Sequence, residues 1–295
     1  MPRPPDLFRG GARGRSGLRR RRNPRVSVGP KPLVSVVIPA YRAARSLPAA
    51  LASVALSGLE PGALEVVIAP DDGHDYSGLE AHGMALTICP GSFMATGAGP
   101  TRNRALAAAR GRFVAFLDAD DTWGAGYLSA LLPLAEGHGA AFGRTCIMVD
   151  GAPILTLPGA GQSELSLHDL GRTGASFHPV LRRDLAGPFV NMPSQDVLHT
   201  AEVLALVGST APLGDAAYNL HVSGSSETAT GDFSARVAAA YEAYIADITA
   251  GKTRIPSDHA DAACAMFRAK SALNAAYTKD GKARPFYAFM ANYLT

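Results

Sequence analysis

The chain has 295 residues, 47% of them hydrophobic and 18% charged, and a formal net charge of +3. This composition is typical of a soluble globular protein with one large domain, and it lacks any apolar run near the ~20 residues that span a bilayer. The three cysteines are scattered without metal-binding spacing, which is typical of a reducing compartment, so we expect a cytoplasmic protein.

The first 31 residues differ in composition from the rest. They carry nine Arg and one Lys against Asp6, a net charge of +9, so that residues 32–295 sum to −6. With almost no apolar side chains this segment cannot bury enough surface to fold alone, and we predict a disordered Arg-rich tail over 1–31. Such a tail is either inert or a weak peripheral contact with anionic lipid at the inner face of the membrane. We expect no nucleic-acid partner.

Strands and helices alternate through the first part of the chain. The expected elements are a strand over 33–38, a helix over 46–56, strands over 64–69 and 86–89, a helix over 101–110 with Gly111 as its C-terminal cap, and a strand over 113–117. This alternation predicts an α/β fold with a mainly parallel central sheet flanked by helices.

Beyond Trp123 the periodicity weakens. The expected elements are a helix over 127–134, a strand pair over 141–149 and 153–157, a helix over 197–205 with Ser194 as its N-cap, and Ala-rich helices over 233–250 and 258–277 before an aromatic tail. We therefore predict a sheet domain over 32–230 and a C-terminal helical extension over 231–295.

Polar residues follow the three strongest predicted strands: Tyr41 and Arg42, then Asp71 and Asp72, then Asp118, Asp120 and Asp121. In an open parallel sheet such strand ends meet at one edge, where ligands bind. Three neighbouring carboxylates repel one another unless a cation lies between them, and Mg²⁺ or Mn²⁺ completes its shell with water and substrate phosphates. The alternative is a solvated acidic turn.

Four ordered motifs resemble the family 2 glycosyltransferases over residues 33–225. They are Val34-Ser35-Val36-Val37-Ile38-Pro39-Ala40-Tyr41, Asp71-Asp72-Gly73, Arg102-Asn103 before Ala109-Arg110-Gly111, and Phe116-Leu117-Asp118-Ala119-Asp120-Asp121. The resemblance implies a single domain of the GT-A type and a nucleotide-sugar donor. Two residues depart from the pattern: Arg42 stands where Asn is common, and His74 replaces the usual Ser-containing continuation.

The resemblance also implies site residues. It assigns nucleotide-sugar binding to residues at the strand ends and the following helix: Pro39, Ala40, Tyr41, Asp71, Asp72, Arg102, Asp118 and Ala119. It assigns Mn²⁺ or Mg²⁺ binding to Asp118 and Asp120, with His221 as the counterpart of a late histidine in some relatives. The competing interpretations are a core tyrosine at 41, an exposed helix arginine at 102 and a structural histidine at 221.

In inverting relatives an Asp in a Glu-Asp pair at a helix start takes the proton of the acceptor hydroxyl. Gln195-Asp196 occupies the corresponding place, with Gln195 in place of the acid. The resemblance therefore implies that Asp196 is the catalytic base, and the alternative is a carboxylate that only stabilises the helix start.

The resulting hypothesis is an inverting, metal-dependent glycosyltransferase. It would move a sugar from a nucleoside diphosphate, with uridine expected, to a hydroxyl of a glycan or lipid-linked acceptor in cell-surface polysaccharide assembly. One alternative is a non-catalytic glycosyltransferase-like nucleotide-binding module. Another is a nucleotidyltransferase, but that chemistry commonly uses a Gly-rich phosphate loop with Lys, and the segment after the first predicted strand has none.

Overall fold

A computed structural model of the chain describes residues 31–92, 94–222, 233–281 and 285–293. Apart from Lys31, the predicted tail over 1–31 lies outside these ranges. Contacts join Lys31–Thr295 into one unit.

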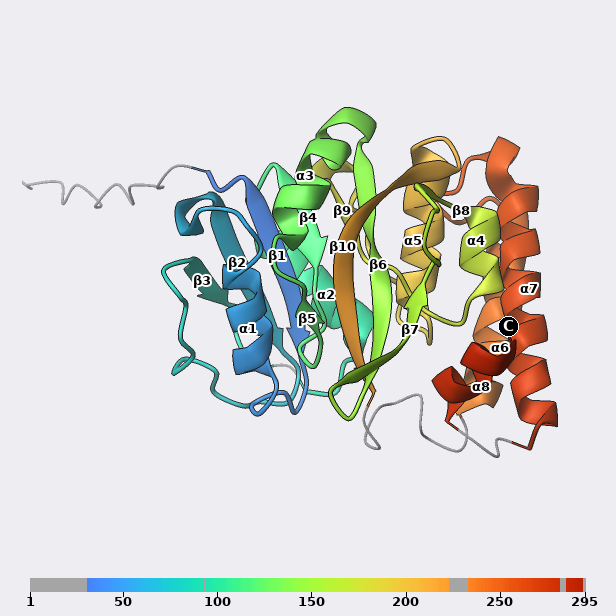
Figure 1. The fold of residues 1–295 in the computed structure, drawn as a ribbon, viewed down its shortest axis with the longest axis horizontal. Helices are drawn as coiled ribbons and strands as arrows, with labels where there is room; N and C mark the ends of the chain where they lie inside the picture. Colours follow the sequence, from blue (N-terminus) through green and yellow to red (C-terminus); the bar gives the residue numbers. More distant parts are fainter. Residues whose placement is uncertain (1–30, 93, 223–232, 282–284, 294–295) are drawn as a thin grey trace, which may run out of the picture. The chain divides into compact units, whose positions relative to one another are not determined.

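The first part of this unit alternates strand and helix, as predicted (Figure 1). The elements are β1 (Val34–Ala40), α1 (Leu47–Ala55), β2 (Leu64–Pro70), β3 (Ala85–Ile88), α2 (Ala98–Ala108) and β4 (Phe113–Phe116). Strand β1 pairs in parallel with β2 and β4, and β2 pairs in parallel with β3. Every residue of β2 and β4 is buried, which is why these segments read as continuous apolar runs.

The second part adds β5 (Thr122–Trp123), α3 (Tyr127–His138), β6 (Ala140–Val149), β7 (Ala152–Leu157), β8 (Glu164–Ser166), α4 (Leu167–Arg172), β9 (Pro179–Arg182), α5 (Gln195–Leu206) and β10 (Thr210–Val222). Within the described residues the sheet runs β3-β2-β1-β4-β9-β6-β10-β5. Strand β9 is antiparallel to both β4 and β6, so the sheet is parallel through its first four strands and mixed beyond them. The α/β prediction is confirmed, although β5, β8, β9, β10 and α4 were not expected.

The sheet separates two hydrophobic clusters because successive strand residues point to opposite faces. Val37 and Val67 belong to the cluster that includes α2, α4 and α5, whereas Val36 and Val66 belong to the cluster that includes α1 and α3. Both faces of the strands are therefore covered, and the strand ends remain as the place where polar side chains gather.

The C-terminal helices are α6 (Phe233–Thr249), α7 (Ala260–Lys279) and α8 (Phe286–Tyr293), and they lie at the end of the sheet away from β3 (Figure 1). Helix α7 packs on α4, and Tyr244 and Phe267 join the same core cluster as α5. The predicted helical extension is present, and it shares its core with the sheet. Among the described helices, none combines the length and hydropathy of a bilayer-spanning segment.

One local prediction was wrong, and another was right in position alone. Helix α2 ends at Ala108, and its C-cap is Ala109 in an extended conformation, so Gly111 is not the cap. A Cβ on Gly111 would lie 2.6 Å from the backbone nitrogen of Ser35, so this glycine permits the close approach of β4 to β1. Ser194 does precede α5, but it has φ 56° and its side chain makes no capping hydrogen bond.

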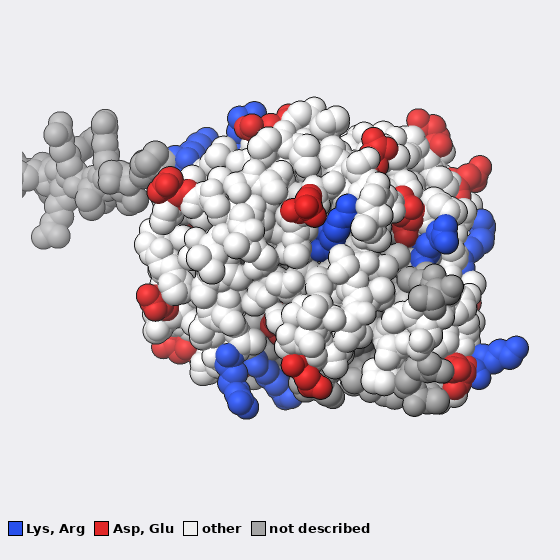
Figure 2. Space-filling model, viewed as in Figure 1, with Lys and Arg blue, Asp and Glu red and all other residues white. Residues whose placement is uncertain are grey.

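Charged side chains are interspersed on the face shown in Figure 2 and lie mostly around its rim. The described residues of this face carry both signs close together, without a concentrated basic surface. Charge on this face therefore gives no reason to expect a polyanionic partner.

Candidate active site

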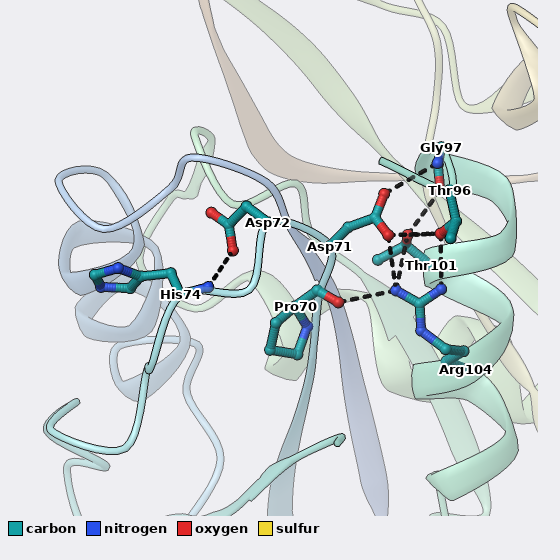
Figure 3. Close-up of polar contacts among 8 residues, drawn as sticks. All are labelled: Pro70, Asp71, Asp72, His74, Thr96, Gly97, Thr101 and Arg104. Carbon is teal, nitrogen blue, oxygen red and sulfur yellow. Dashed lines mark hydrogen bonds and ion pairs between the residues drawn. The ribbon is translucent and has the colours of Figure 1, made fainter. Parts of the chain in front are cut away.

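Asp71 links the end of β2 to the start of α2 (Figure 3). Its Oδ1 accepts hydrogen bonds from Thr96 Oγ1 at 2.6 Å and Arg104 Nη2 at 3.1 Å, and its Oδ2 accepts from the Gly97 amide at 3.0 Å. Burial alone would raise the pKa of this carboxyl, but the hydrogen bonds from Thr96, Gly97 and Arg104 outweigh it and lower the pKa. Asp71 is thus a fixed carboxylate that orients the first turn of α2, and its predicted contact with a nucleotide base stays a prediction.

Asp72 fixes the two loops on either side of it. Its Oδ2 accepts from the Arg42 amide at 2.6 Å and the Tyr76 hydroxyl at 2.9 Å, and its Oδ1 accepts from the His74 amide at 3.0 Å. The neighbouring Tyr41 side chain is 51% exposed, with the Arg42 guanidinium 5.1 Å from its ring centre. Tyr41 is therefore not a core tyrosine: its ring is accessible at the carboxyl end of β1, where a flat ligand could stack.

Three other residues that were predicted to bind the nucleotide sugar have little side-chain surface for a ligand to contact. Ala40 and Ala119 are buried, and the Ala40 carbonyl accepts from the Asp71 amide at 2.8 Å. Pro39 is half-buried within β1. These residues shape the backbone at the strand ends.

Arg102 is buried and forms an ion pair with Asp118. Its guanidinium lies 5.5 Å from the ring centre of Phe189, and no acceptor in the described residues engages its Nε and Nη1. Burial alone would raise the pKa of Asp118, but Arg102 and the His178 ring, 3.8 Å away, lower it. Arg102 is therefore not an exposed helix residue. It is a buried cation with unused donors, which suits an anionic ligand.

Asp120 and Asp121 continue the acidic end of β4. Asp121 is buried, and its Oδ1 accepts from the His221 amide at 2.8 Å. Burial and the charges of Asp118 and Asp120 raise the pKa of Asp121 well above its usual value. Asp120 is exposed at the edge of the strand end, where partial desolvation and then the Asp118 charge raise the pKa of its carboxyl. The structure therefore brings His221, whose Nε2 lies 2.9 Å from Thr122 Oγ1, beside the carboxylates from which it is distant in sequence.

Arg102 is paired with Asp118, whereas the pKa values of Asp120 and Asp121 are raised by desolvation and by the neighbouring carboxylates. Hard carboxylate oxygens are the ligands that Mg²⁺ and Mn²⁺ prefer, and such ions are often held by only one or two carboxylates plus water and phosphate. Asp118 and Asp120 fit that pattern. Across the described residues no group of three or more His, Cys, Asp or Glu is arranged to hold a metal ion. Metal binding stays a prediction.

A cavity of about 410 Å³ joins the acidic strand end to the start of α5. Its lining includes Arg102, Asp118, Asp120, Asp121, Asp196 and His221. Asp196 lies in the first turn of α5, and no hydrogen bond or ion pair within the described residues engages its carboxylate. The structure thus brings the predicted base and the predicted metal ligands to one cavity, while Tyr41, Asp71 and Asp72 lie at neighbouring strand ends outside its lining.

Comparison with known proteins bears on the family and the fold. Residues 35–151 match the model of glycosyl transferase family 2. The chain carries a family 2 glycosyltransferase domain. A similar protein, the UDP-Glc:alpha-D-GlcNAc-diphosphoundecaprenol beta-1,3-glucosyltransferase WfgD of Escherichia coli, is 32% identical over 113 residues, which are 37% of this chain and 44% of WfgD. The match thus spans less than half of that relative.

Solved structures of S. aureus TarS share the fold. TarS residues 1–349 give a TM-score of 0.59 at 19% identity, over 80% of this chain and 71% of TarS. The same protein in complex with UDP-GlcNAc gives a TM-score of 0.60 at 18% identity, over 80% and 72% of the two chains. The glycosyltransferase domain therefore has the GT-A fold, as the resemblance implied.

Helices α6–α8 line the same cavity as the glycosyltransferase domain's acidic motif, which the sequence did not reveal. Tyr241 and Lys270 belong to this lining, and the Tyr244 hydroxyl donates to the Pro193 carbonyl at 2.7 Å, just before α5. One signal was present: Lys270 interrupts the apolar stripe of α7, which includes Phe267 and Leu273. A charged residue at helical spacing within such a stripe is unusual in a buried face.

Proposed function

We propose that the protein is an inverting glycosyltransferase that moves a sugar from a UDP-sugar to a hydroxyl of a lipid-linked sugar. The observation that carries the proposal is the cavity in which Asp196, without a hydrogen-bonding partner among the described residues, lies with the acidic end of β4. A base and a diphosphate site within one cavity are what transfer from a nucleotide sugar to a hydroxyl requires.

The donor half of the site is supported by the unused donors of Arg102 and the exposed ring of Tyr41. Arg102 would donate to oxygens of the diphosphate, and Tyr41 would stack on the base. Uridine is supported by the relatives, since the name of WfgD states UDP-Glc as its donor and TarS has been solved with UDP-GlcNAc.

Asp118 and Asp120 would hold Mn²⁺ or Mg²⁺, with His221 close by. Such an ion, when bound, supplies positive charge against the charge that grows on the departing nucleoside diphosphate. Asp118 also keeps Arg102 in place, so the loss of its carboxylate would disturb both the cation site and the arginine.

Asp196 would accept the proton of the acceptor hydroxyl. As that oxygen forms its bond to the anomeric carbon, the bond to the diphosphate breaks on the opposite face, and the configuration inverts. The name of WfgD states a GlcNAc on diphosphoundecaprenol as the acceptor of that protein, which supports a lipid-linked acceptor here. A role in cell-surface polysaccharide assembly and the predicted peripheral membrane contact through residues 1–31 belong to the same proposal.

The experiment compares Asp196→Asn with Asp169→Asn. Asp169 closes a capping box with Ser166 at the start of α4, so it is a carboxylate with a purely structural role. Asp196→Asn should lower turnover by ~10²–10⁴-fold with UDP affinity unchanged. Asp169→Asn should lower stability and leave turnover near the wild-type value.

The outcome also separates the proposal from its alternatives. Near-normal turnover of Asp196→Asn would make Asp196 a helix-stabilising carboxylate, and NMR of the product would reject inversion if the donor's configuration were retained. A protein that binds UDP but neither transfers nor hydrolyses a UDP-sugar, with or without Mn²⁺, would be a binding module.

A further inference from the structure

Lys270 is a buried ammonium on the wall of the active-site cavity. Its side chain is 2% exposed, and its Nζ donates to the carbonyls of Thr173 at 2.7 Å and Ala175 at 3.3 Å. A lysine ammonium has three N–H donors, so one remains without an acceptor among the described residues. Gly174 and Ser176, from the segment that Lys270 contacts, line the same cavity.

A purely structural role does not account for the charge. A neutral amide could donate to the same two carbonyls, whereas burial makes the ammonium costly and lowers the pKa of Lys270 to about 7, against the opposing effect of Asp196. With a pKa of about 7 the amine is partly neutral at pH 7, and its two N–H groups then suffice for the two carbonyls. An anion that enters the cavity would favour the charged form and accept its third N–H.

The positions of the charges indicate where such an anion would lie. The acidic end of β4 supplies Asp118 and Asp120, and Arg102 from α2 is paired with Asp118. Lys270 reaches the cavity from α7, which belongs to the C-terminal helices and not to the strand ends that carry the family motifs. The ammonium thus belongs to a different wall from the predicted diphosphate site of the donor.

We propose that Lys270 binds a phosphate oxygen of the acceptor, so that the acceptor is a sugar phosphate or diphosphate whose hydroxyl lies at Asp196. This inference rests on the proposed function and assigns a residue of this chain to the phosphate of the acceptor. A phosphate directly on the acceptor sugar places the anion one sugar ring from the attacking hydroxyl, and one cavity holds both Lys270 and Asp196. The diphosphate of the donor is the other anion that Lys270 could bind, and the experiment distinguishes the donor from the acceptor.

The test is a calorimetric titration of N-acetylglucosamine 1-phosphate into the protein of residues 1–295, saturated with UDP. The phosphate-free comparison is methyl N-acetylglucosaminide. The variants are Lys270→Met, which removes donors and charge, and Lys270→Gln, which keeps a donor for the carbonyls of Thr173 and Ala175. Lys279→Met is the matched control, because Lys279 is an exposed lysine on the same helix.

The wild type should bind the phosphate ester about tenfold or more tightly than the glycoside. Both Lys270 variants should lose that preference and keep their UDP affinity, and Lys279→Met should behave as the wild type. Equal binding of ester and glycoside by the wild type would overturn the inference even if neither variant folds. Unchanged ester affinity in the variants would overturn it as well. Loss of UDP affinity in a folded variant would assign the ammonium to the donor.

Failure of the proposed function would give a different result. In that case UDP itself would not bind the wild type, or Asp196→Asn would retain turnover. The inference on Lys270 fails instead when the wild type binds UDP and either the phosphate-ester arms show no preference or only the Lys270 variants lose UDP affinity.

Discussion

Replacing Gly99 by alanine tests whether turnover requires the loop before α5 to keep its position against α2. Gly99 is in the first turn of α2 and faces the segment that leads to Asp196. A Cβ at this position would lie 2.1 Å from the Val190 carbonyl oxygen and 3.0 Å from its carbon. Carbon and oxygen atoms in ordinary contact are ~3.3 Å apart, so α2 and the loop would have to separate by about 1 Å.

Two opposing effects set the magnitude. Alanine is favoured over glycine in a helix by ~1 kcal/mol, whereas overpacking against backbone costs ~1–3 kcal/mol. The free energy of unfolding should therefore change little or fall by up to ~2 kcal/mol. Turnover should fall much more, because a displacement of ~1 Å at a reacting group costs on the order of 10²-fold in rate.

Gly137→Ala is the matched control. Gly137 lies within α3, is exposed, and would place a new Cβ with no atom within 4 Å. This variant should gain ~1 kcal/mol in unfolding free energy and keep its turnover. Urea unfolding and steady-state transfer rates, with UDP affinity as the check on the donor site, give the comparison. A Gly99→Ala enzyme within threefold of the wild-type rate would refute the argument.

Three further predictions follow from single contacts. Asp120→Asn should weaken UDP binding in Mn²⁺ to the affinity that the wild type shows in EDTA, as measured by calorimetry; equal wild-type affinity with and without Mn²⁺ would reject the metal site. Glu65→Gln should lower the free energy of unfolding by ~1–3 kcal/mol at pH 7, because the buried carboxylate accepts from Ser35 Oγ at 2.5 Å and Arg110 Nε at 2.9 Å. Burial alone would raise the pKa of Glu65, but these hydrogen bonds lower it below 4.5. Its contribution to stability is therefore fully present above that pH and decreases as the pH falls through the lowered value; a difference from Gln that did not decrease with falling pH below 4.5 would contradict this. Asn103→Ala should reduce turnover more than UDP affinity, because its side chain exchanges two hydrogen bonds of 2.8 Å with the backbone of Phe189 in the loop before α5; equal losses of both would place its role elsewhere.

The sequence by itself predicted the strand and helix alternation through β4 and the polar strand ends. Each of these features is local: apolar runs mark β1, β2 and β4, and the acidic residues directly follow β4 in the chain. Parallel strands of one sheet necessarily bring such ends to the same edge, so the candidate site could be placed without tertiary information. The four ordered motifs also identified the family and, through it, the GT-A fold.

Only the tertiary structure decided the walls of the cavity. Arg102 looks like an exposed helix residue until β4 brings Asp118 beside it. His221 reaches Asp121 across 100 residues, and Lys270 reaches Thr173 across 97. No periodicity or motif encodes such contacts, because they depend on how β10 enters the sheet and how α7 packs on α4. A chain with the same local patterns and a different packing of its C-terminal helices would keep the acidic strand end and lose the ammonium in the cavity.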